Sequence, residues 1–306
     1  MKISVIGACN IDITTKLSND IKLYDSNLSK IKMSMGGVGR NVANNLSLLG
    51  QDVSMFTAIS NDNFGQMIKD HSNKNNIDLS NAIFSNDYSQ SIYLCVNDKQ
   101  GDLIIGANDM DIINLISIDY LKEKLEILNS SDCVVFDTNL TSEAIEFLST
   151  NITKPCFVDT VSITKAEKLA TVLNKTNVNI YALKTNKLEC EVLTGIKIEK
   201  GEDFIRSSKY LHEKGITNVC ISLGSKGVFY STPTDEYIVP SKVASIVSTN
   251  GAGDAFLAGM IYAYSKNAFS QDVIKYGLSA SKITCESENA VNENMNVFNL
   301  ENEFNK

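Results

Sequence analysis

A short run near the C-terminal end of the sequence combines residues that could bind an anion and move a proton. The run reads Ser248-Thr249-Asn250-Gly251-Ala252-Gly253-Asp254, and an apolar stretch typical of a helix follows it. Small residues let backbone N–H groups approach a ligand, and a helix N-terminus adds unpaired donors and partial positive charge. Asp254 is then either the N-cap of that helix or a general base. As a base it would deprotonate a hydroxyl while the amides of residues 251–253 stabilise a phosphoryl group.

A second glycine-rich run lies near the N-terminus. Residues 2–7 alternate as a strand ending at Gly7, and Asn10 and Asp12 follow. These two side chains either contact a ligand beyond the carboxyl end of the strand or form a turn with their own backbone. The run Gly36-Gly37-Val38-Gly39-Arg40-Asn41 then opens an amphipathic helix that Gly50 closes. Glycines here would let the backbone press against a small polar ligand, and Asn41 could bond its hydroxyl groups.

The remaining pattern predicts a three-layer α/β/α domain with a mostly parallel sheet over residues 1–306. Strands at 52–58, 133–136, 155–159, 178–183 and 218–222 alternate with helices at 63–74, 118–129, 141–150, 163–173 and 202–214. Two segments break this pattern: irregular residues 13–35 and a hairpin within 90–107. Together they could form a small sheet over the strand ends, a lid that excludes water.

Polar residues follow several of these strands, at the edge where α/β enzymes place their chemistry. The residues are Asp137 and Asn139, Asp159, Asn186 and Glu189, and the segment from Ser222 to Gly227. A row of such residues, together with the anion-type helix start, indicates a ligand site at this edge.

Composition excludes several classes of function. The net charge of -8 and pI of about 4.9 are opposite to those of a nucleic-acid backbone binder. No apolar run is long enough to span a membrane, no signal-peptide pattern opens the chain, and the seven scattered cysteines read as reduced core residues of a cytoplasmic protein. With two histidines, a histidine-based metal site or triad is not expected.

Taken together, the motifs resemble the ribokinase-like, or PfkB-type, carbohydrate and nucleoside kinases. The resemblance covers essentially the whole chain, in the family's order. It rests on Gly36-Gly37 with Asn41, on Asn186 with Glu189, on Ser222-Leu223-Gly224-Ser225-Lys226-Gly227, and on Asn250-Gly251-Ala252-Gly253-Asp254-Ala255-Phe256. Within the family, four segments resemble the pseudouridine kinases: the run from Gly37 to Leu46, the hairpin from Tyr93 to Ile112, the run Val158-Asp159-Thr160-Val161-Ser162 and the run Leu183-Lys184-Thr185-Asn186-Lys187-Leu188-Glu189.

The resemblance implies ATP- and Mg²⁺-dependent transfer of a phosphoryl group to the 5′-hydroxyl of a nucleoside, with pseudouridine as the expected acceptor. The alternatives are a sibling kinase for a free sugar or another nucleoside, and a nucleotide-binding regulator without catalysis. Asp254 would be the base and residues 251–253 the phosphoryl site. Asp12, Asn41 and Gly37 would hold the ribose hydroxyls, and Asn10 and Tyr93 would face the base. Asn186 and Glu189 would organise Mg²⁺ through water. Ser222, Gly224, Ser225, Gly227 and Asn292 would contact ATP.

Two positions leave questions open within the resemblance. Many family members have aspartate where this chain has Ser248, and that aspartate helps to bind a monovalent cation, so such a cation is in doubt here. Arg40 could reach the triphosphate or the acceptor, or it could pair with an acidic neighbour on the first helix turn. The exposed edges of the lid make a homodimer through the lid a further expectation.

Overall fold

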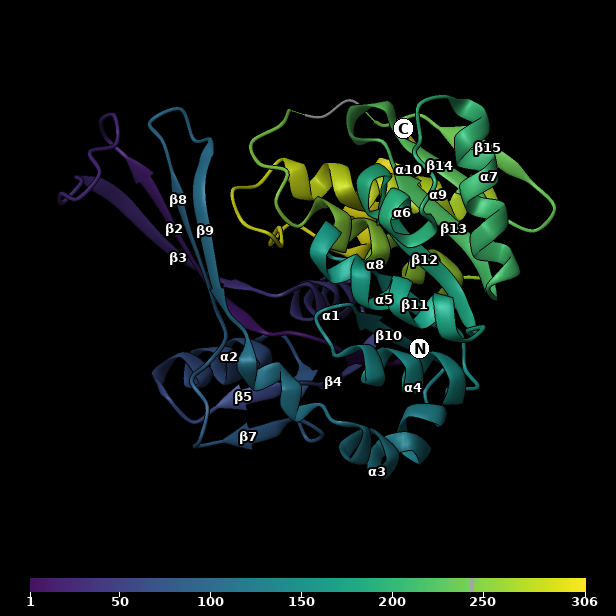
Figure 1. Ribbon diagram of the computed structural model, residues 1–306, viewed down its shortest axis with the longest axis horizontal. Helices are drawn as coiled ribbons and strands as arrows, with labels where there is room; N and C mark the ends of the chain where they lie inside the picture. Colours follow the sequence, from purple (N-terminus) through teal and green to yellow (C-terminus); the bar gives the residue numbers. More distant parts are fainter. Residues whose placement is uncertain (243–244) are drawn as a thin grey trace.

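The computed structural model describes residues 1–242 and 245–306, and it shows a large α/β body from which a smaller sheet projects (Figure 1). The body holds nine strands in the order β15-β14-β13-β12-β11-β10-β1-β4-β6. In chain order these are β1 (Lys2–Ile6), β4 (Asp52–Phe56), β6 (Ile77–Asp78), β10 (Cys133–Asp137), β11 (Cys156–Asp159), β12 (Ile180–Asn186), β13 (Ile216–Ser222), β14 (Val228–Ser231) and β15 (Glu236–Val239). Strands β1 to β13 of this sheet pair in parallel, and β14 and β15 extend it in antiparallel. The predicted mostly parallel sheet is confirmed.

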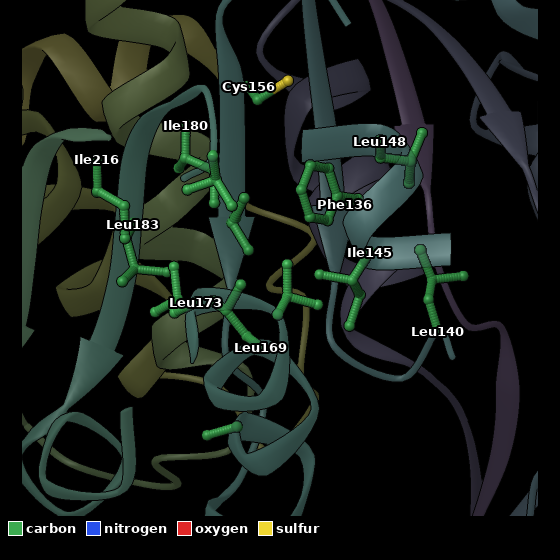
Figure 2. Packing of buried hydrophobic residues seen from close by; sticks show 14 of the residues in the cluster. Phe136, Leu140, Ile145, Leu148, Cys156, Leu169, Leu173, Ile180, Leu183 and Ile216 are labelled. Carbon is green, nitrogen blue, oxygen red and sulfur yellow. The ribbon is translucent and has the colours of Figure 1, made fainter. Parts of the chain in front are cut away.

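Helices cover both faces of this sheet. One face carries α3 (Ile118–Asn129), α4 (Ser142–Asn151), α5 (Ile163–Lys175), α6 (Lys187–Thr194) and α7 (Gly201–Glu213). The other carries α1 (Val38–Leu48), α2 (Asn63–Lys74), α8 (Ala252–Ser265) and α9 (Ser270–Cys285), and α10 (Val297–Phe304) packs on α9. Parallel strands buried on both faces need near-continuous apolar sequence. The run 133–136 supplies it, and Figure 2 shows Phe136 of β10 close to Ile145 and Leu148 of α4.

The projecting sheet is built from the two segments that interrupt the βα pattern, and we call it the lid sheet. It contains β2 (Asn10–Leu17), β3 (Ser29–Gly36), β8 (Ile92–Asn97) and β9 (Leu103–Asp109) in the order β3-β2-β8-β9. Strands β2 and β8, far apart in the sequence, pair in parallel, whereas β2 with β3 and β8 with β9 are antiparallel (Figure 1).

The register of the lid sheet sorts its side chains into two faces. Asp12 lies opposite Tyr93, and Tyr93 lies opposite Asn108, so one row crosses three strands on one face. The next row, on the other face, contains Ile13, Met33 and Leu94, and it is largely apolar. Part of this apolar face is exposed, since Met33 and Leu94 both retain more than a third of their surface.

The chain order around β1 creates a topological switch point at the carboxyl edge of the body. Strand β1 lies between β4 and β10, so the chain runs to opposite sides of it at this point. Such switch points are where open α/β sheets bind ligands. Gly39 of α1 packs directly on Gly7, where a Cβ on Gly39 would lie 2.9 Å from the Gly7 Cα. The buried Asp137 carboxylate accepts the Gly39 amide at 2.9 Å and holds the glycine-rich loop in place.

Some elements depart from the sequence predictions. The strand expected at 52–58 divides into β4 and β5 (Ala58–Ser60), and β5 leaves the main sheet to pair with β7 (Ile83–Ser85). Short 3₁₀ helices η1 (Asp111–Leu115) and η2 (Gly224–Lys226) follow β9 and β13. Throughout the described part of the chain, every helix is too short or too polar to cross a membrane. The seven cysteines, all within that part, are unpaired.

Candidate active site

The N-terminus of α8 places Asp254 beside Asn41 of α1. Gly251 is the residue that caps the helix, and it has a φ of 76°. A Cβ at Gly251 would lie 1.9 Å from the carbonyl oxygen of Ala290, so this backbone and its close approach both require glycine. Asp254 is the third residue of the helix, and its side chain makes no capping bond, so the N-cap alternative for Asp254 is wrong. Only 7% of its surface is exposed.

Three backbone amides at this helix start are available to a ligand. Among the described residues, the N–H groups of Gly251, Gly253 and Asp254 donate no hydrogen bond, whereas the Ala252 N–H donates to the carbonyl of Thr249 at 3.3 Å. The free amides are therefore those of 251, 253 and 254, rather than the predicted 251 to 253. Unpaired donors at a helix N-terminus suit an anion such as a phosphoryl group.

Asn41 of α1 positions the Asp254 carboxylate. The Asn41 Nδ2 donates to Asp254 Oδ2 at 2.6 Å, which leaves Oδ1 without a partner among the described residues. Arg40 in turn donates from Nη2 to Asn41 Oδ1 and to the carbonyl of Met35, the latter at 2.6 Å. Arg40 is buried, and the first turn of α1 holds no acidic residue, so the alternative that Arg40 pairs with an acidic neighbour there is wrong. Its contact with the triphosphate or the acceptor stays a prediction.

A half-buried lysine to which the sequence analysis gave no role adds a positive charge near Asp254. Lys184 of β12 stands in register with Asp159 of β11, and its Nζ forms an ion pair with Asp159 Oδ2 at 3.0 Å. A Cβ at Gly253 would lie 2.5 Å from the same Nζ, so the ammonium lies against the start of α8. Lysine is almost never fully buried unless paired. A lysine at the end of an apolar strand was the signal available in the sequence.

These neighbours set the proton affinity of Asp254. Burial, and then the negative charge of Asp159, raise the pKa of Asp254 to about 7, while Lys184, Asn41 and Arg40 lower it. Burial lowers the pKa of Lys184, but the carboxylates of Asp159, Asp254 and Glu189 outweigh it, so this pKa is raised overall. A carboxylate with a pKa near neutrality is matched to general-base catalysis.

Asn10 and Asp12 lie where the lid sheet joins the body. Both belong to β2, so the alternative that they form a turn is wrong. Asn10 Nδ2 donates to Asp12 Oδ1 at 2.5 Å, and the Asp12 carboxylate lies over Gly36, where any Cβ would collide with it. Burial raises the pKa of Asp12 to about 6, against the lowering effects of Arg40 and Asn10. Gly37 adopts a φ of 94° beside Ala8, a conformation that suits glycine.

The row of lid residues that begins at Asp12 leads toward a polar cavity. Tyr93 is half-buried on the same face as Asp12, and Asn108 follows it on β9. Asn108 lines a cavity of about 410 Å³ together with Asn139, which follows β10, and Lys168 of α5. Lys168 holds the backbone at this point by donating to the carbonyls of Asn139 and Leu140 at 2.8 and 2.7 Å.

Asn186 and Glu189 form a capping box at the start of α6. The Asn186 side chain accepts the Glu189 N–H at 2.9 Å, and Glu189 Oε2 accepts the Asn186 N–H at 3.1 Å. Asn186 Nδ2 and the Thr160 hydroxyl also donate to the buried Glu189 carboxylate. In the described residues, no group of three His, Cys, Asp or Glu side chains could hold a metal ion. A role for this pair in binding Mg²⁺ through water stays a prediction.

The predicted ATP-binding residues lie along β13 and the segments near it. Ser222 is in register with Asn186, and Gly224 and Ser225 form η2 directly after β13. Gly227 has a φ of 105° and lies against the carbonyl of Val239. Asn292 lies elsewhere, in the loop after α9. Its side chain donates to the Ile283 carbonyl at 2.5 Å and accepts the Asn294 N–H at 2.9 Å. Contacts of these residues with ATP stay predictions.

The fold and this site define a ribokinase-like phosphotransferase with a hydroxyl acceptor. The model of the pfkB family carbohydrate kinases matches residues 1–296, and the chain belongs to that family. It is therefore a PfkB-type sugar or nucleoside kinase.

Individual relatives agree with this assignment. The chain is 32% identical to the pseudouridine kinase of Escherichia coli K12, over 97% of this chain and 94% of the relative. It is 25% identical to the guanosine-inosine kinase of Exiguobacterium acetylicum, over 95% of this chain and 96% of the relative. A crystal structure of a putative sugar kinase from Clostridium perfringens is similar with a TM-score of 0.85 and 27% identity, covering 99% of this chain and 95% of that one. Arabidopsis thaliana ribokinase, solved with ribose and ATP, shares the fold with a TM-score of 0.84 at 18% identity, over 99% of this chain and 98% of that one.

Proposed function

We propose that this protein transfers the γ-phosphoryl group of ATP to the 5′-hydroxyl of a nucleoside, and that pseudouridine is the acceptor. The observation that carries the proposal is Asp254, a buried carboxylate with a pKa of about 7 beside three unpaired amides. A base and an anion site within one helical turn are what phosphoryl transfer to a hydroxyl requires.

The residues around Asp254 support different roles for its two carboxylate oxygens. Asn41 holds Oδ2, and Oδ1 is left to accept the proton of the acceptor hydroxyl. The amides of 251, 253 and 254, with the Lys184 ammonium beside them, would stabilise the charge on the phosphoryl oxygens as they pass between donor and acceptor. Most of the catalysis would come from this positioning and electrostatic stabilisation.

The lid sheet supports a nucleoside rather than a free sugar as acceptor. Asp12 would hold ribose hydroxyls, and the row through Tyr93 to Asn108 crosses two strand spacings. Two spacings amount to roughly 10 Å, which suits a ribose at one end and a base at the other. The cavity lined by Asn108 and Asn139 offers amide groups to the edge of a base. Pseudouridine carries an additional ring N–H, which an amide oxygen there could accept.

ATP and Mg²⁺ belong to the proposal as co-substrate and cofactor. When bound, Mg²⁺ would neutralise charge on the ATP phosphates, and it typically keeps several waters and uses few carboxylates. Glu189, whose oxygens already accept from Asn186 and Thr160, could contact those waters and not the metal directly. The unpaired cysteines support a reducing compartment, the cytoplasm, as the location of the protein.

The test is ADP release by the purified protein with Mg-ATP and one acceptor at a time: pseudouridine, uridine, cytidine, adenosine, inosine, ribose or fructose 6-phosphate. We expect pseudouridine to be preferred, and Asp254→Asn to lower turnover by about 10²- to 10⁴-fold. The matched control is Asp87→Asn, at an exposed aspartate outside the site. Preference for another acceptor would overturn the assignment of pseudouridine. An Asp254→Asn variant within a few-fold of wild type would overturn the general base.

A further inference from the structure

A second cavity of about 470 Å³ lies between the lid sheet and the body, and it shares Arg40 with the site described above. Its walls come from four segments: β3, α1, the C-terminal end of α2, and the loop 289–293 that follows α9. Neither Asp12, Asp254 nor the segment from Ser222 to Gly227 is among its lining residues. The residues on which the argument depends are Met33, Arg40, Asn44, His71, Lys74 and Val291.

Two of the residues that line this cavity carry a buried polar atom without a partner among the described residues. Asn44 of α1 is only 4% exposed, and its Oδ1 accepts no hydrogen bond from the described residues. The Nδ1 of His71 is likewise buried and without a partner within that part of the chain. A buried polar atom left unpaired costs about 1–3 kcal/mol, so native proteins rarely retain one without a reason. A ligand that donates to Asn44 would remove this cost.

The charges around the cavity favour an anion. Arg40 uses Nε and Nη2 to bond the backbone and Asn41, while no hydrogen bond from its Nη1 exists among the described residues. Lys74 adds an exposed ammonium, and Glu293 is the one acid among the lining residues. Burial, with the charges of Arg40 and Lys74, lowers the pKa of His71 to about 4, so this ring is neutral near pH 7.

We propose that this cavity is a regulatory site for a small organic phosphate of nucleotide type, a nucleoside monophosphate. The phosphate would bind Arg40 Nη1 and Lys74, a base N–H would donate to Asn44 Oδ1, and the planar base would lie against Met33 and Val291. Arginine and lysine are the usual phosphate ligands, and apolar walls with few placed polar groups are typical of small-molecule sites. The inference goes beyond the proposed function and does not depend on it.

Two structural connections make occupancy of this cavity relevant to activity. Strand β3 forms one wall and is an edge strand of the lid sheet, so a ligand would restrain the lid relative to the body. Arg40 bonds Asn41, and Asn41 bonds Asp254, so Arg40, which would hold the ligand, lies two hydrogen bonds from Asp254. An effector shifts a conformational equilibrium when it binds one conformation more tightly than the other. A ligand that contacts both the lid sheet and the body would favour the lid position in which both contacts are made.

The first test is equilibrium binding by calorimetry, with the full chain pre-saturated with Mg²⁺ and a non-hydrolysable ATP analogue. The probes are UMP, AMP, inorganic phosphate and uridine. We expect a monophosphate to bind at least tenfold tighter than uridine or inorganic phosphate, and Lys74→Glu and Asn44→Leu each to weaken it at least tenfold. Lys209→Glu, a matched change at an exposed lysine of α7, should leave affinity unchanged. Because Lys74 is exposed, that variant reports on binding even if Asn44→Leu folds poorly.

Three outcomes of this titration would overturn the site: no binding by any probe at millimolar concentration, equal affinity for inorganic phosphate and the nucleotides, or affinities that neither Lys74→Glu nor Asn44→Leu changes. A second readout is hydrogen exchange of the β3 peptide, residues 29–36. We expect UMP or AMP to slow exchange there in the wild type and not in Asn44→Leu. Unchanged exchange in a wild-type protein that binds the nucleotide would overturn the connection to the lid.

Discussion

The ion pair between Lys184 and Asp159 gives the sharpest test of the electrostatics around Asp254. Replacing Lys184 by methionine keeps the length of the side chain and removes its charge. Asp159 is only 1% exposed, so the change would strand a buried carboxylate. At 3.0 Å, the attraction is about 5–6 kcal/mol at an effective dielectric constant of about 20. Because each ion loses hydration on burial, breaking such a pair from one side typically costs about 3–5 kcal/mol.

We therefore expect Lys184→Met to lower the free energy of unfolding by about 3–5 kcal/mol, measured by urea denaturation. The double variant Lys184→Met/Asp159→Asn should recover most of that loss, because no unpaired buried charge remains. A double variant as unstable as the sum of the two single variants would show that the residues do not act as a pair.

The single variants Lys184→Met and Asp159→Asn should shift the pH dependence of activity in opposite directions. The acidic limb of kcat/KM reports the pKa of the base in the free enzyme, here about 7 for Asp254. Lys184 lowers that pKa and Asp159 raises it. Lys184→Met should therefore move the limb to higher pH, and Asp159→Asn to lower pH, each by about one pH unit or more. Limbs that stay in place, or that move in the same direction, would refute the assignment of Asp254 as the base under the control of this pair.

Three further predictions concern neighbouring features. Gly253→Ala places a Cβ 2.5 Å from the Lys184 ammonium. We expect kcat to fall at least about tenfold, which corresponds to about 1.4 kcal/mol of activation free energy, while Tm changes little. An unchanged kcat would show that the position of the ammonium is not critical. The folded-state pKa of Asp254 is raised from 3.8 to about 7. The native state therefore binds the extra proton between these values, and stability should fall as pH rises through this window. Asp254→Asn should flatten that slope in urea titrations at pH 5 and pH 8, and an identical slope would contradict the raised pKa. The third prediction is that the exposed apolar face of the lid sheet pairs with a second chain. Light scattering should then give the mass of two chains for the wild type and of one chain for Ile105→Glu, because the Ile105 residue is 60% exposed. A one-chain mass for both proteins would exclude the pairing.

Much of the fold was predictable because its determinants are local. Buried parallel strands need apolar runs, and helix starts need capping side chains. Ser117 and Thr141, which come directly before α3 and α4, accept the N–H groups of Tyr120 and Ala144 as helix N-cap residues do. The lid was predictable for the opposite reason, since two β segments had no place in a βα pattern. What could not be foreseen is which strands they pair with, because the β2–β8 register is set by contacts across 80 residues of chain.

The site was predictable at the level of the strand ends and less so at the level of single atoms. The carboxyl edge of a parallel sheet had to gather Asp159 and Asn186. The sequence could not show that Lys184 turns toward Asp159, nor that Arg40 bonds carbonyls instead of a carboxylate. It also left open whether Asp254 caps its helix, because that depends on a glycine φ angle three residues earlier. Side-chain partners of this kind are fixed by packing between segments distant in the sequence.

The way the lid sheet joins the body constrains how specificity can change in such a protein. Asn10 begins β2, Gly36 ends β3, and the two are paired at the joint between the lid sheet and the body. Asp12 and Gly37, which are expected to hold the ribose, lie within two residues of this joint. A substitution at this joint would therefore change the binding of the ribose and the placement of the lid sheet together. Tyr93 and Asn108 lie further across the lid sheet, in β8 and β9. A change of acceptor should therefore come more readily from substitutions at these outer positions than from substitutions at the joint.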